Sequence, residues 1–367
     1  MSAALREISR ALVAWFHRGH REMPWRETRD PYAIWVSEIM LQQTRVETVR
    51  GYYTRWMARL PTVRSLAEAP MDDVLSLWSG LGYYARARNL KAAAEQLTAR
   101  DGGVVPRDPA ALLALPGVGA YTAGAIASIA FGLPEPILDG NVARVLSRLF
   151  AIDAPAEAAT TKAQLWALAR SLVPADAPSE FNQAMMELGA TVCTPRAPQC
   201  LTCPVAKPCR ARAAGIQDEL PRKRVRKEPP TVDALALVAR CRSRVLLGRR
   251  PARGLWGGLW EPPWVPLEAG VDAEAAAEDV VKRCFDVELS GRPELSTLTH
   301  ELTHRRYRFT VLSGSAPERA TDVEARYEAL RWVEASELAA LGLATWSTRL
   351  LSSQYVPPAR KKPTNQA

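Results

Sequence analysis

The stretch from Leu115 to Asn141, LPGVGAYTAGAIASIAFGLPEPILDGN, combines a glycine-built turn with a single carboxylate. Leu115, Gly117 and Gly119 fall in a tight turn that leads into an apolar helix. Such a turn lets backbone N–H groups converge on a phosphate without side-chain charge. Asp139 follows later, ahead of Asn141 and another helix. A backbone phosphate clamp beside an acid predicts chemistry on a nucleic acid.

Two carboxylates have contrasting surroundings. Glu38 lies in the apolar segment AIWVSEIML (33–41), where it either faces solvent or is buried with a raised pKa and holds a proton near neutral pH. Asp139 precedes an apolar-periodic helix, where it could serve as a simple N-cap. A helix N-terminus also favours the ionised carboxylate. We therefore expect a protonatable Glu38 and an anionic Asp139.

Four of the six cysteines follow the spacing C-x6-C-x2-C-x5-C, at Cys193, Cys200, Cys203 and Cys209. Thiols this close in an intracellular chain predict a metal site rather than disulfides. The spacing alone fits either zinc or an iron–sulfur cluster. The remaining two cysteines are far away in sequence and are expected to be buried apolar residues.

Composition sets wider limits. A chain of 367 residues is long enough for two domains, and its net charge of +9 favours polyanionic partners, nucleic acid first. The sequence contains no run of about 18 apolar residues, so no transmembrane helix is predicted. The N-terminal segment has helical amphipathic spacing and lacks a signal-peptide cleavage pattern. We expect no membrane partner and a cytoplasmic, nucleoid-associated location.

The first half of the sequence predicts an all-α domain over residues 1–215, because no strand-like alternation appears before about residue 232. Thr, Pro, Asp and Gly separate the candidate helices. These cover residues 3–18, 31–44, 46–58, 71–79, 84–100, 109–114, 120–131, 141–150, 160–172 and 180–190.

The second half predicts an α+β domain over residues 232–355. VDALALVARCRSRVLLGRR alternates as two strands, DAEAAAEDVVKRCF is helical, and THELTHRRYRFTVL predicts one further strand. Residues 216–231 form a basic, proline-flanked linker that is either a DNA-facing strap or merely solvated. Residues 356–367 are predicted to be a disordered basic tail.

Several long motifs occur in order: VSEIMLQQTRVETV, WSGLGYYARARNL, ILDGNVARVL and FNQAMMELGA. Together with the hairpin and the cysteine loop, they resemble the helix-hairpin-helix base-excision glycosylases of the endonuclease III superfamily, and within it the MutY family of adenine DNA glycosylases. The resemblance implies a [4Fe–4S] cluster at the four cysteines and a MutT-like (Nudix-fold) second domain. That domain lacks the Nudix R-E-x-x-E-E run, so we expect a reader rather than a second hydrolase.

The resemblance also implies catalytic roles. Glu38 would protonate adenine, Asp139 would stabilise the sugar cation, and Asn141 would orient the acids. Tyr121 stands where bifunctional relatives have a lysine that forms a Schiff base with the sugar. A phenol cannot form that imine, which predicts a monofunctional glycosylase. The alternative for Tyr121 is a packed core aromatic.

Further binding roles carry over by position. The adenine-pocket residues would be Trp25, Arg26, Leu41 and Gln183. The residues that contact the DNA or 8-oxoguanine would be Gln42, Gln43, Thr44, Tyr83, Leu115, Gly117, Gly119, Leu302, Thr303 and His304. Leu302 replaces an aromatic of the family's Phe-Ser-His loop, and Ala143 replaces a lysine that traps DNA in some members. Tyr83 could instead pack at a helix end, and His304 could be an ordinary surface group.

These observations predict a monomeric enzyme of base excision repair that removes adenine opposite 8-oxoguanine or guanine in double-stranded DNA. The nearest alternative is a pyrimidine-lesion glycosylase with lyase activity, which Tyr121 and the second domain oppose. A catalytically silent iron–sulfur protein that binds DNA or senses redox state is a third possibility. The retained Glu38, Asp139 and Asn141 oppose it.

Overall fold

The computed structural model describes residues 2–222, 228–268 and 270–354. The chain divides into two compact units, one of residues 1–69 and 89–226 and the other of residues 70–88 and 227–367. A short segment of the helical half, with helix α5 (Met71–Trp78), therefore groups with the C-terminal unit. The basic tail predicted at 356–367 and the basic run at 223–227 lie outside the described residues.

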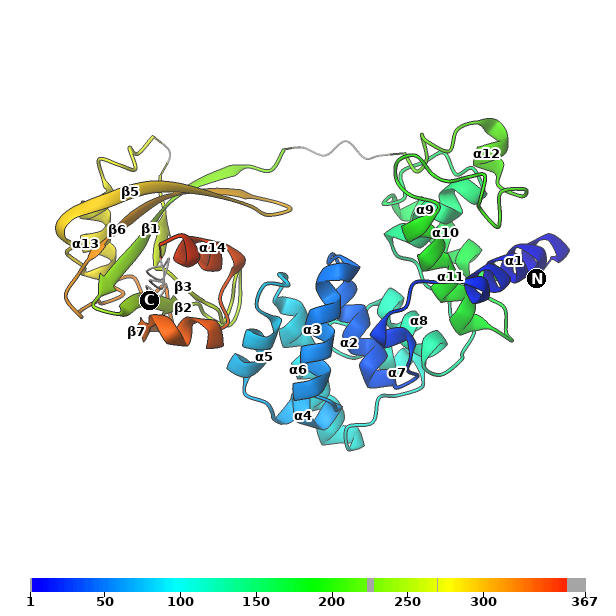
Figure 1. Ribbon diagram of the computed structural model, residues 1–367, viewed down its shortest axis with the longest axis horizontal. Coiled ribbons are helices and arrows are strands. Elements are labelled where there is room, and N and C mark those ends of the chain that lie inside the picture. Colours follow the sequence, from blue (N-terminus) through cyan, green and yellow to red (C-terminus); the bar gives the residue numbers. More distant parts are fainter. Residues whose placement is uncertain (1, 223–227, 269, 355–367) are drawn as a thin grey trace, which may run out of the picture. The chain divides into compact units, whose positions relative to one another are not determined.

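The first unit is helical, which confirms the all-α expectation (Figure 1). The sequence missed three short elements, η1 (Pro24–Arg26), α4 (Val63–Glu68) and α12 (Arg210–Ala214). The other helices are α1 (Ala3–Arg18), α2 (Pro31–Leu41), α3 (Val46–Arg59), α6 (Ala85–Asp101), α7 (Pro109–Leu113), α8 (Ala120–Ile129), α9 (Gly140–Leu149), α10 (Ala159–Leu172) and α11 (Pro178–Thr191). Among the described residues, no helix is long and apolar enough to span a membrane.

Helix α2 carries Glu38 into the interior of the first unit. The Asp30 side chain accepts a hydrogen bond from the Tyr32 amide (3.0 Å), and Pro31 occupies the first turn, so the helix begins here. Every residue from Tyr32 to Met40 is buried. The helix ends at Leu41 rather than at the predicted residue 44, and Gln43 has a φ of 57° outside it.

A hairpin at Leu115–Gly119 joins α7 to α8. Gly117 has a φ of 76°, and a Cβ added there would lie 2.7 Å from the Cβ of Asn89. Only glycine fits this turn without strain. Gly124 on α8 packs even more tightly, because an added Cβ would lie 2.2 Å from the Pro136 carbonyl oxygen. The segment that leads to Asp139 is thereby held against α8.

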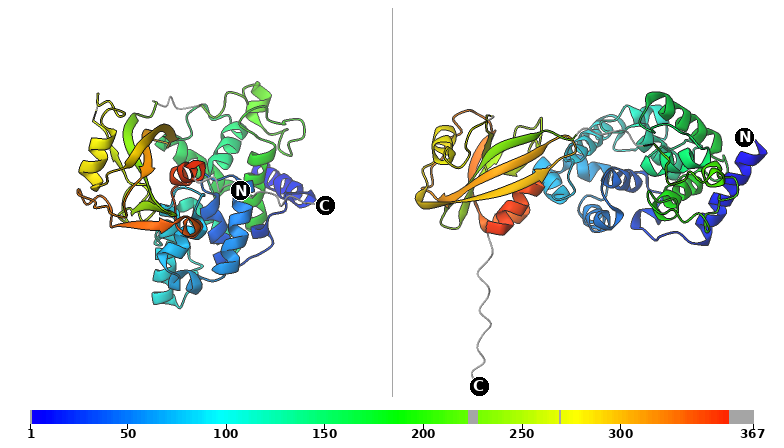
Figure 2. Two further views of the ribbon diagram at one scale, coloured as in Figure 1. Left: turned by 60° about the vertical axis from the view of Figure 1, so that its left-hand side comes forward. Right: turned by 90° about the horizontal axis from the view of Figure 1, so that it is seen from above.

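The second unit is built on a mixed sheet with the order β3-β2-β1-β6-β5, in which β4 also pairs with β1 and β7 with β2. Strands β1 and β6 are parallel, and the other pairs are antiparallel. Helices α13 and α14 lie on opposite sides of the sheet (Figure 2). The elements are β1 (Thr231–Cys241), β2 (Arg244–Arg249), β3 (Trp260–Glu261), β4 (Trp264–Pro266), α13 (Ala277–Phe285), β5 (Ser290–Glu301), β6 (Arg306–Ser315), β7 (Ala329–Glu334), η2 (Ala335–Ala340) and α14 (Thr345–Gln354).

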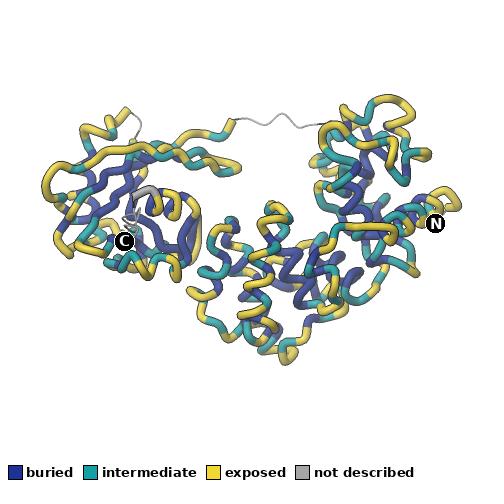
Figure 3. The backbone as a smooth tube through the Cα atoms, in the orientation of Figure 1, coloured by how far each residue is buried: buried dark blue, intermediate teal, exposed yellow. Residues whose placement is uncertain are grey.

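Two strand predictions need correction. The first strand does not alternate in burial, since residues 234–239 are all buried between the two helix-covered faces (Figure 3). The segment 299–312 is not one strand but the end of β5, a turn and the start of β6. The turn is closed by a hydrogen bond from the Leu302 amide to the Arg305 carbonyl (2.8 Å). His304 therefore lies in a hairpin turn rather than on a strand.

The first part of the predicted linker packs against the first unit. Leu220 is buried, and its carbonyl accepts a hydrogen bond from Nε of Arg148 (2.9 Å). Arg222 forms ion pairs with Asp153 and Glu219. Residues 216–222 are thus fixed by the helical unit, so a free strap cannot begin before residue 223.

Candidate active site

A pocket of about 780 Å³ lies in the first unit, between α2, α8, α9 and α11. Its size is within the range of small-ligand sites and suits a nucleoside. The predicted residues that line it are Trp25, Arg26, Glu38, Leu41, Gln42, Gln43, Thr44, Gly117, Gly119, Tyr121, Asp139, Asn141 and Gln183. Residues far apart in the sequence therefore form one site.

Glu38 is buried in this pocket and hydrogen-bonded to Tyr121. The Tyr121 hydroxyl donates to Oε2 of Glu38 (2.5 Å) and lies 3.2 Å from Sδ of Met186. Burial raises the pKa of Glu38 to about 7, and the negative charge of Asp139 adds to this effect, while Tyr121 and Arg26 oppose it. A carboxyl group with such a pKa can hold a proton near neutral pH and donate it.

Asp139 caps helix α9, as predicted. Its Oδ1 accepts a hydrogen bond from the Val142 amide (2.7 Å), and its Oδ2 accepts one from Nδ2 of Asn141 (2.9 Å). The expected negative charge on Asp139 stays a prediction, because opposing influences act on its ionisation. Burial raises the pKa of Asp139, while the hydrogen bonds to Val142 and Asn141 and the charge of Arg144 oppose that rise.

The two halves of the chain match different families. Residues 36–171 match the HhH-GPD superfamily of base excision DNA repair proteins, and residues 234–353 match the NUDIX domain. The human adenine DNA glycosylase is 37% identical over an alignment of 392 positions, which covers 91% of this chain and 71% of the human protein.

The chain belongs to the adenine DNA glycosylase family.

Solved structures agree with this assignment for the helical half. A thermostable thymine-DNA glycosylase is similar with a TM-score of 0.52 and 30% identity, covering 57% of this chain and 98% of that one. An endonuclease III bound non-covalently to DNA is similar with a TM-score of 0.50 and 25% identity, covering 58% of this chain and 97% of that one. The protein is a DNA glycosylase of base excision repair, and it acts on DNA.

Several pocket side chains of the glycosylase are held by their neighbours. Nε2 of Gln183 donates to Oγ of Ser179 (3.1 Å) one turn earlier on α11. Nε2 of Gln42 donates to Oγ1 of Thr122 (3.3 Å) on α8. Leu115, by contrast, is buried and does not line the pocket, and its amide donates to the Leu112 carbonyl (3.1 Å) rather than facing a phosphate.

The remaining predicted residues of the glycosylase lie in the second unit. Tyr83 is 50% exposed and has a φ of 48°, a strained conformation for a non-glycine residue. Its hydroxyl lies 2.9 Å from Oγ1 of Thr303. Thr303 and His304 are exposed in the β5–β6 turn, whereas Leu302 is half-buried. The structure thus brings the predicted wedge residue together with the predicted sensing loop.

The four cysteines Cys193, Cys200, Cys203 and Cys209 line a second, largely apolar pocket beside α9 and α11. Burial raises the pKa of Cys203 to about 11, and the other three thiols add to this effect. NH1 of Arg148 lies 3.4 Å from Sγ of Cys193. Among the described residues, no three His, Cys, Asp or Glu side chains are arranged to hold a single metal ion.

Sequence reasoning missed three residues of the active site. Met186 contacts Tyr121, and Glu187 binds two arginines of the pocket wall. Arg144 donates to Oδ1 of Asn141 (2.9 Å) and to the Cys193 carbonyl (2.8 Å). Helical spacing could have identified two of these residues. Glu187 follows the predicted Gln183 by one helical turn, and Arg144 follows the predicted Asn141 by three residues, so each shares a helix face with a predicted pocket residue.

Proposed function

We propose that this enzyme is a monofunctional adenine DNA glycosylase that removes adenine opposite 8-oxoguanine or guanine in double-stranded DNA. The observation that carries the proposal is the buried Glu38 carboxyl group, hydrogen-bonded to Tyr121 beside Asp139. This arrangement places one acid that can hold a proton near a second carboxylate. The pocket takes one flipped-out nucleotide, and the enzyme acts as a monomer.

Hydrolysis of the N-glycosidic bond then divides between the two acids. Glu38 donates a proton to N7 of adenine, and the N9–C1′ bond breaks with its electron pair leaving on the base. Asp139 stabilises the cationic sugar, while Asn141 and Tyr121 hold the carboxylates in place. The deprotonated Glu38 accepts a proton from water as the oxygen bonds to C1′. The products are free adenine and an abasic site.

The assay that tests this function uses duplexes with adenine opposite 8-oxoguanine, guanine or thymine. We expect strand breaks at the adenine opposite 8-oxoguanine or guanine only after alkali is added, because an abasic site needs base-catalysed elimination. Tyr121 offers no amine, so no break should appear without alkali. Nicking without alkali would contradict the monofunctional assignment, and no release of adenine would overturn the proposal.

In this proposal, the second unit recognises the 8-oxoguanine or guanine that lies opposite the adenine. The contact between Tyr83 and Thr303 supports this role, because a wedge at the lesion and a loop that senses it need to act together. We expect His304→Ala to lower the preference for 8-oxoguanine over guanine opposite adenine, measured as the ratio of excision rates. Thr299→Ala, an exposed change on β5, is the control. An unchanged ratio in His304→Ala would contradict the assignment.

The four cysteines are proposed to hold a [4Fe–4S] cluster. Support comes from the shared pocket, the apolar lining and the Arg148 guanidinium, which can donate a hydrogen bond to the Cys193 sulfur. Such a cluster supplies structural stability to the loop. Purified protein should contain iron and acid-labile sulfide in equal amounts and absorb broadly in the visible range. Stoichiometric zinc in freshly isolated protein would contradict the assignment.

A further inference from the structure

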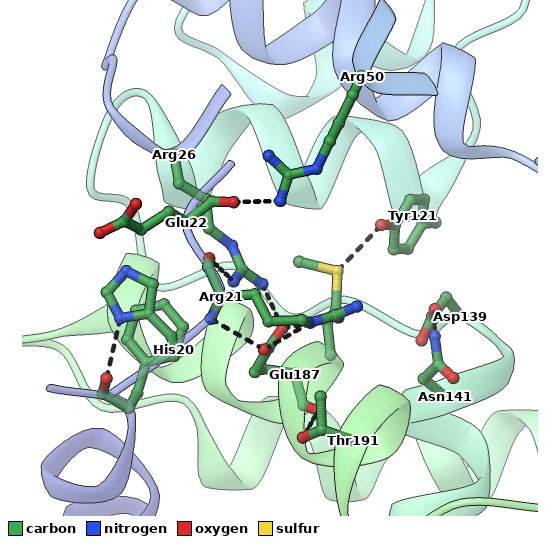
Figure 4. Close-up of polar contacts among 12 residues, drawn as sticks. His20, Arg21, Glu22, Arg26, Arg50, Tyr121, Asp139, Asn141, Glu187 and Thr191 are labelled. Atoms are coloured by element: carbon green, nitrogen blue, oxygen red, sulfur yellow. Dashed lines mark hydrogen bonds and ion pairs between the residues drawn. The ribbon is translucent and has the colours of Figure 1, made fainter. Parts of the chain in front are cut away.

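Glu187 is a buried carboxylate in the wall of the active-site pocket that the mechanism above does not use. It lies on α11, is 2% exposed, and binds two arginines (Figure 4). Its Oε1 accepts from Nε of Arg21 (2.8 Å), and its Oε2 accepts from NH2 of Arg21 (2.9 Å) and NH2 of Arg26 (2.8 Å). Burial opposes ionisation, but the two arginines prevail and lower the pKa of Glu187 to about 2. Glu187 is therefore anionic throughout the working pH range.

Arg26 depends on this carboxylate for both position and charge balance. Its side chain is only 9% exposed, and its other terminal nitrogen donates to the Arg21 carbonyl (2.9 Å). The guanidinium is also stacked over Phe16 at 5.4 Å. Glu187 forms an ion pair with this nearly buried cation. Its positive charge also reaches Glu38, where it favours the ionised carboxylate.

We propose that Glu187 is a positioning residue for the adenine pocket, which fixes Arg26 in the pocket wall and balances the positive charge that Arg26 would otherwise exert on Glu38. This inference rests on the proposed function, in which Glu38 donates the proton that adenine receives. Glu187 touches neither the base nor the sugar in this scheme. Its effect on the reaction passes through Arg26.

Charge balance around Glu38 involves every element of the pocket. The titratable and charged groups that line it are Tyr121 on α8, Asp139 and Arg144 at α9, Glu187 on α11, Arg26 on η1 and Arg21 in the loop before it. With Glu187 ionised, the pocket holds three carboxyl groups and three guanidinium groups. The carboxyl groups are those of Glu38, Asp139 and Glu187, and the guanidinium groups are those of Arg21, Arg26 and Arg144. Removal of the Glu187 charge leaves an excess of positive charge beside a group that has to keep its proton. Because the surroundings have a low dielectric constant, the effect of this excess charge on the ionisation of Glu38 should be large.

The test is the pH profile of single-turnover adenine excision by Glu187→Gln. In the wild-type enzyme, the rate should fall as pH rises past the point where Glu38 loses its proton. In Glu187→Gln this descending limb should move to lower pH by about one unit. The variant should then be about tenfold slower than the wild type above pH 8 and close to it near pH 5.5. A purely structural role would slow excision equally at every pH.

Three further variants make the test specific. Glu180→Gln removes a more exposed partner of Arg29 on the same helix, outside the pocket, and should leave the limb in place. Glu187→Asp keeps the charge and should retain the wild-type limb even if the overall rate falls. Arg26→Met should move the limb to higher pH, and Glu187→Gln added to it should move the limb by less than it does in the wild type. Arg26→Met also gives a result if Glu187→Gln does not fold.

The outcomes separate the two proposals. The role of Glu187 is overturned if the descending limb of the pH profile stays at the wild-type pH in Glu187→Gln, or if excision slows equally at every pH. In both cases adenine excision by the wild type still supports the proposed function. If the wild type releases no adenine, or its rate has no descending limb, the proposed function fails first.

Discussion

Glu38→Gln is expected to abolish adenine release and leave DNA binding intact. Glutamine has nearly the same shape and can still accept the hydrogen bond from Tyr121, but it carries no acidic proton. Loss of a general acid should slow excision by at least ~10²-fold. Single-turnover excision, with binding to the same duplex measured by fluorescence anisotropy, checks both parts. Normal turnover would sink the mechanism.

A matched control exists in the second unit. Burial raises the pKa of Glu261 to about 7, as it does for Glu38, against the opposing charge of Arg250. Glu261 is fully buried but does not line the active-site pocket. Glu261→Gln should therefore change thermal stability without removing adenine excision. If both variants lost activity to the same degree, the effect of Glu38→Gln would reflect folding rather than proton transfer.

Local patterns were sufficient to predict much of the helical fold and the central acids. Asp139 precedes an apolar-periodic helix, and it caps that helix in the structure. The apolar residues around Glu38 allowed either exposure or burial, the family resemblance favoured burial, and Glu38 is buried on α2. The hairpin glycines predicted a tight turn, and Gly117 has the positive φ that such a turn requires.

Long-range contacts account for what the sequence could not predict. The net pKa shift of Asp139 depends on how deeply the folded chain buries it, which a helix cap alone does not reveal. The pairing of Arg26 with Glu187 joins residues 161 positions apart. The contact between Tyr83 and Thr303 joins residues 220 positions apart. The β5–β6 turn was missed because alternation continues across the polar residues that form it.

Asp139→Asn is the second substitution with a large expected effect, and it isolates charge from structure. Asparagine is as good an N-cap as aspartate, so helix α9 should keep its start and the hydrogen bond from the Val142 amide. It cannot stabilise a cationic sugar. Removal of one well-placed electrostatic contact costs ~10²–10³-fold in rate, and we expect a loss of at least that size in single-turnover excision.

The pH dependence distinguishes this variant from Glu38→Gln. The negative charge of Asp139 helps to raise the pKa of Glu38, so its removal should lower that pKa. The residual activity of Asp139→Asn should therefore still fall with rising pH, but the fall should begin at lower pH than in the wild type. The residual activity of Glu38→Gln should lack this limb, because the titrating acid is gone. Asp139→Asn with a wild-type rate, or with its limb unmoved, would mean that Asp139 serves only as a helix cap.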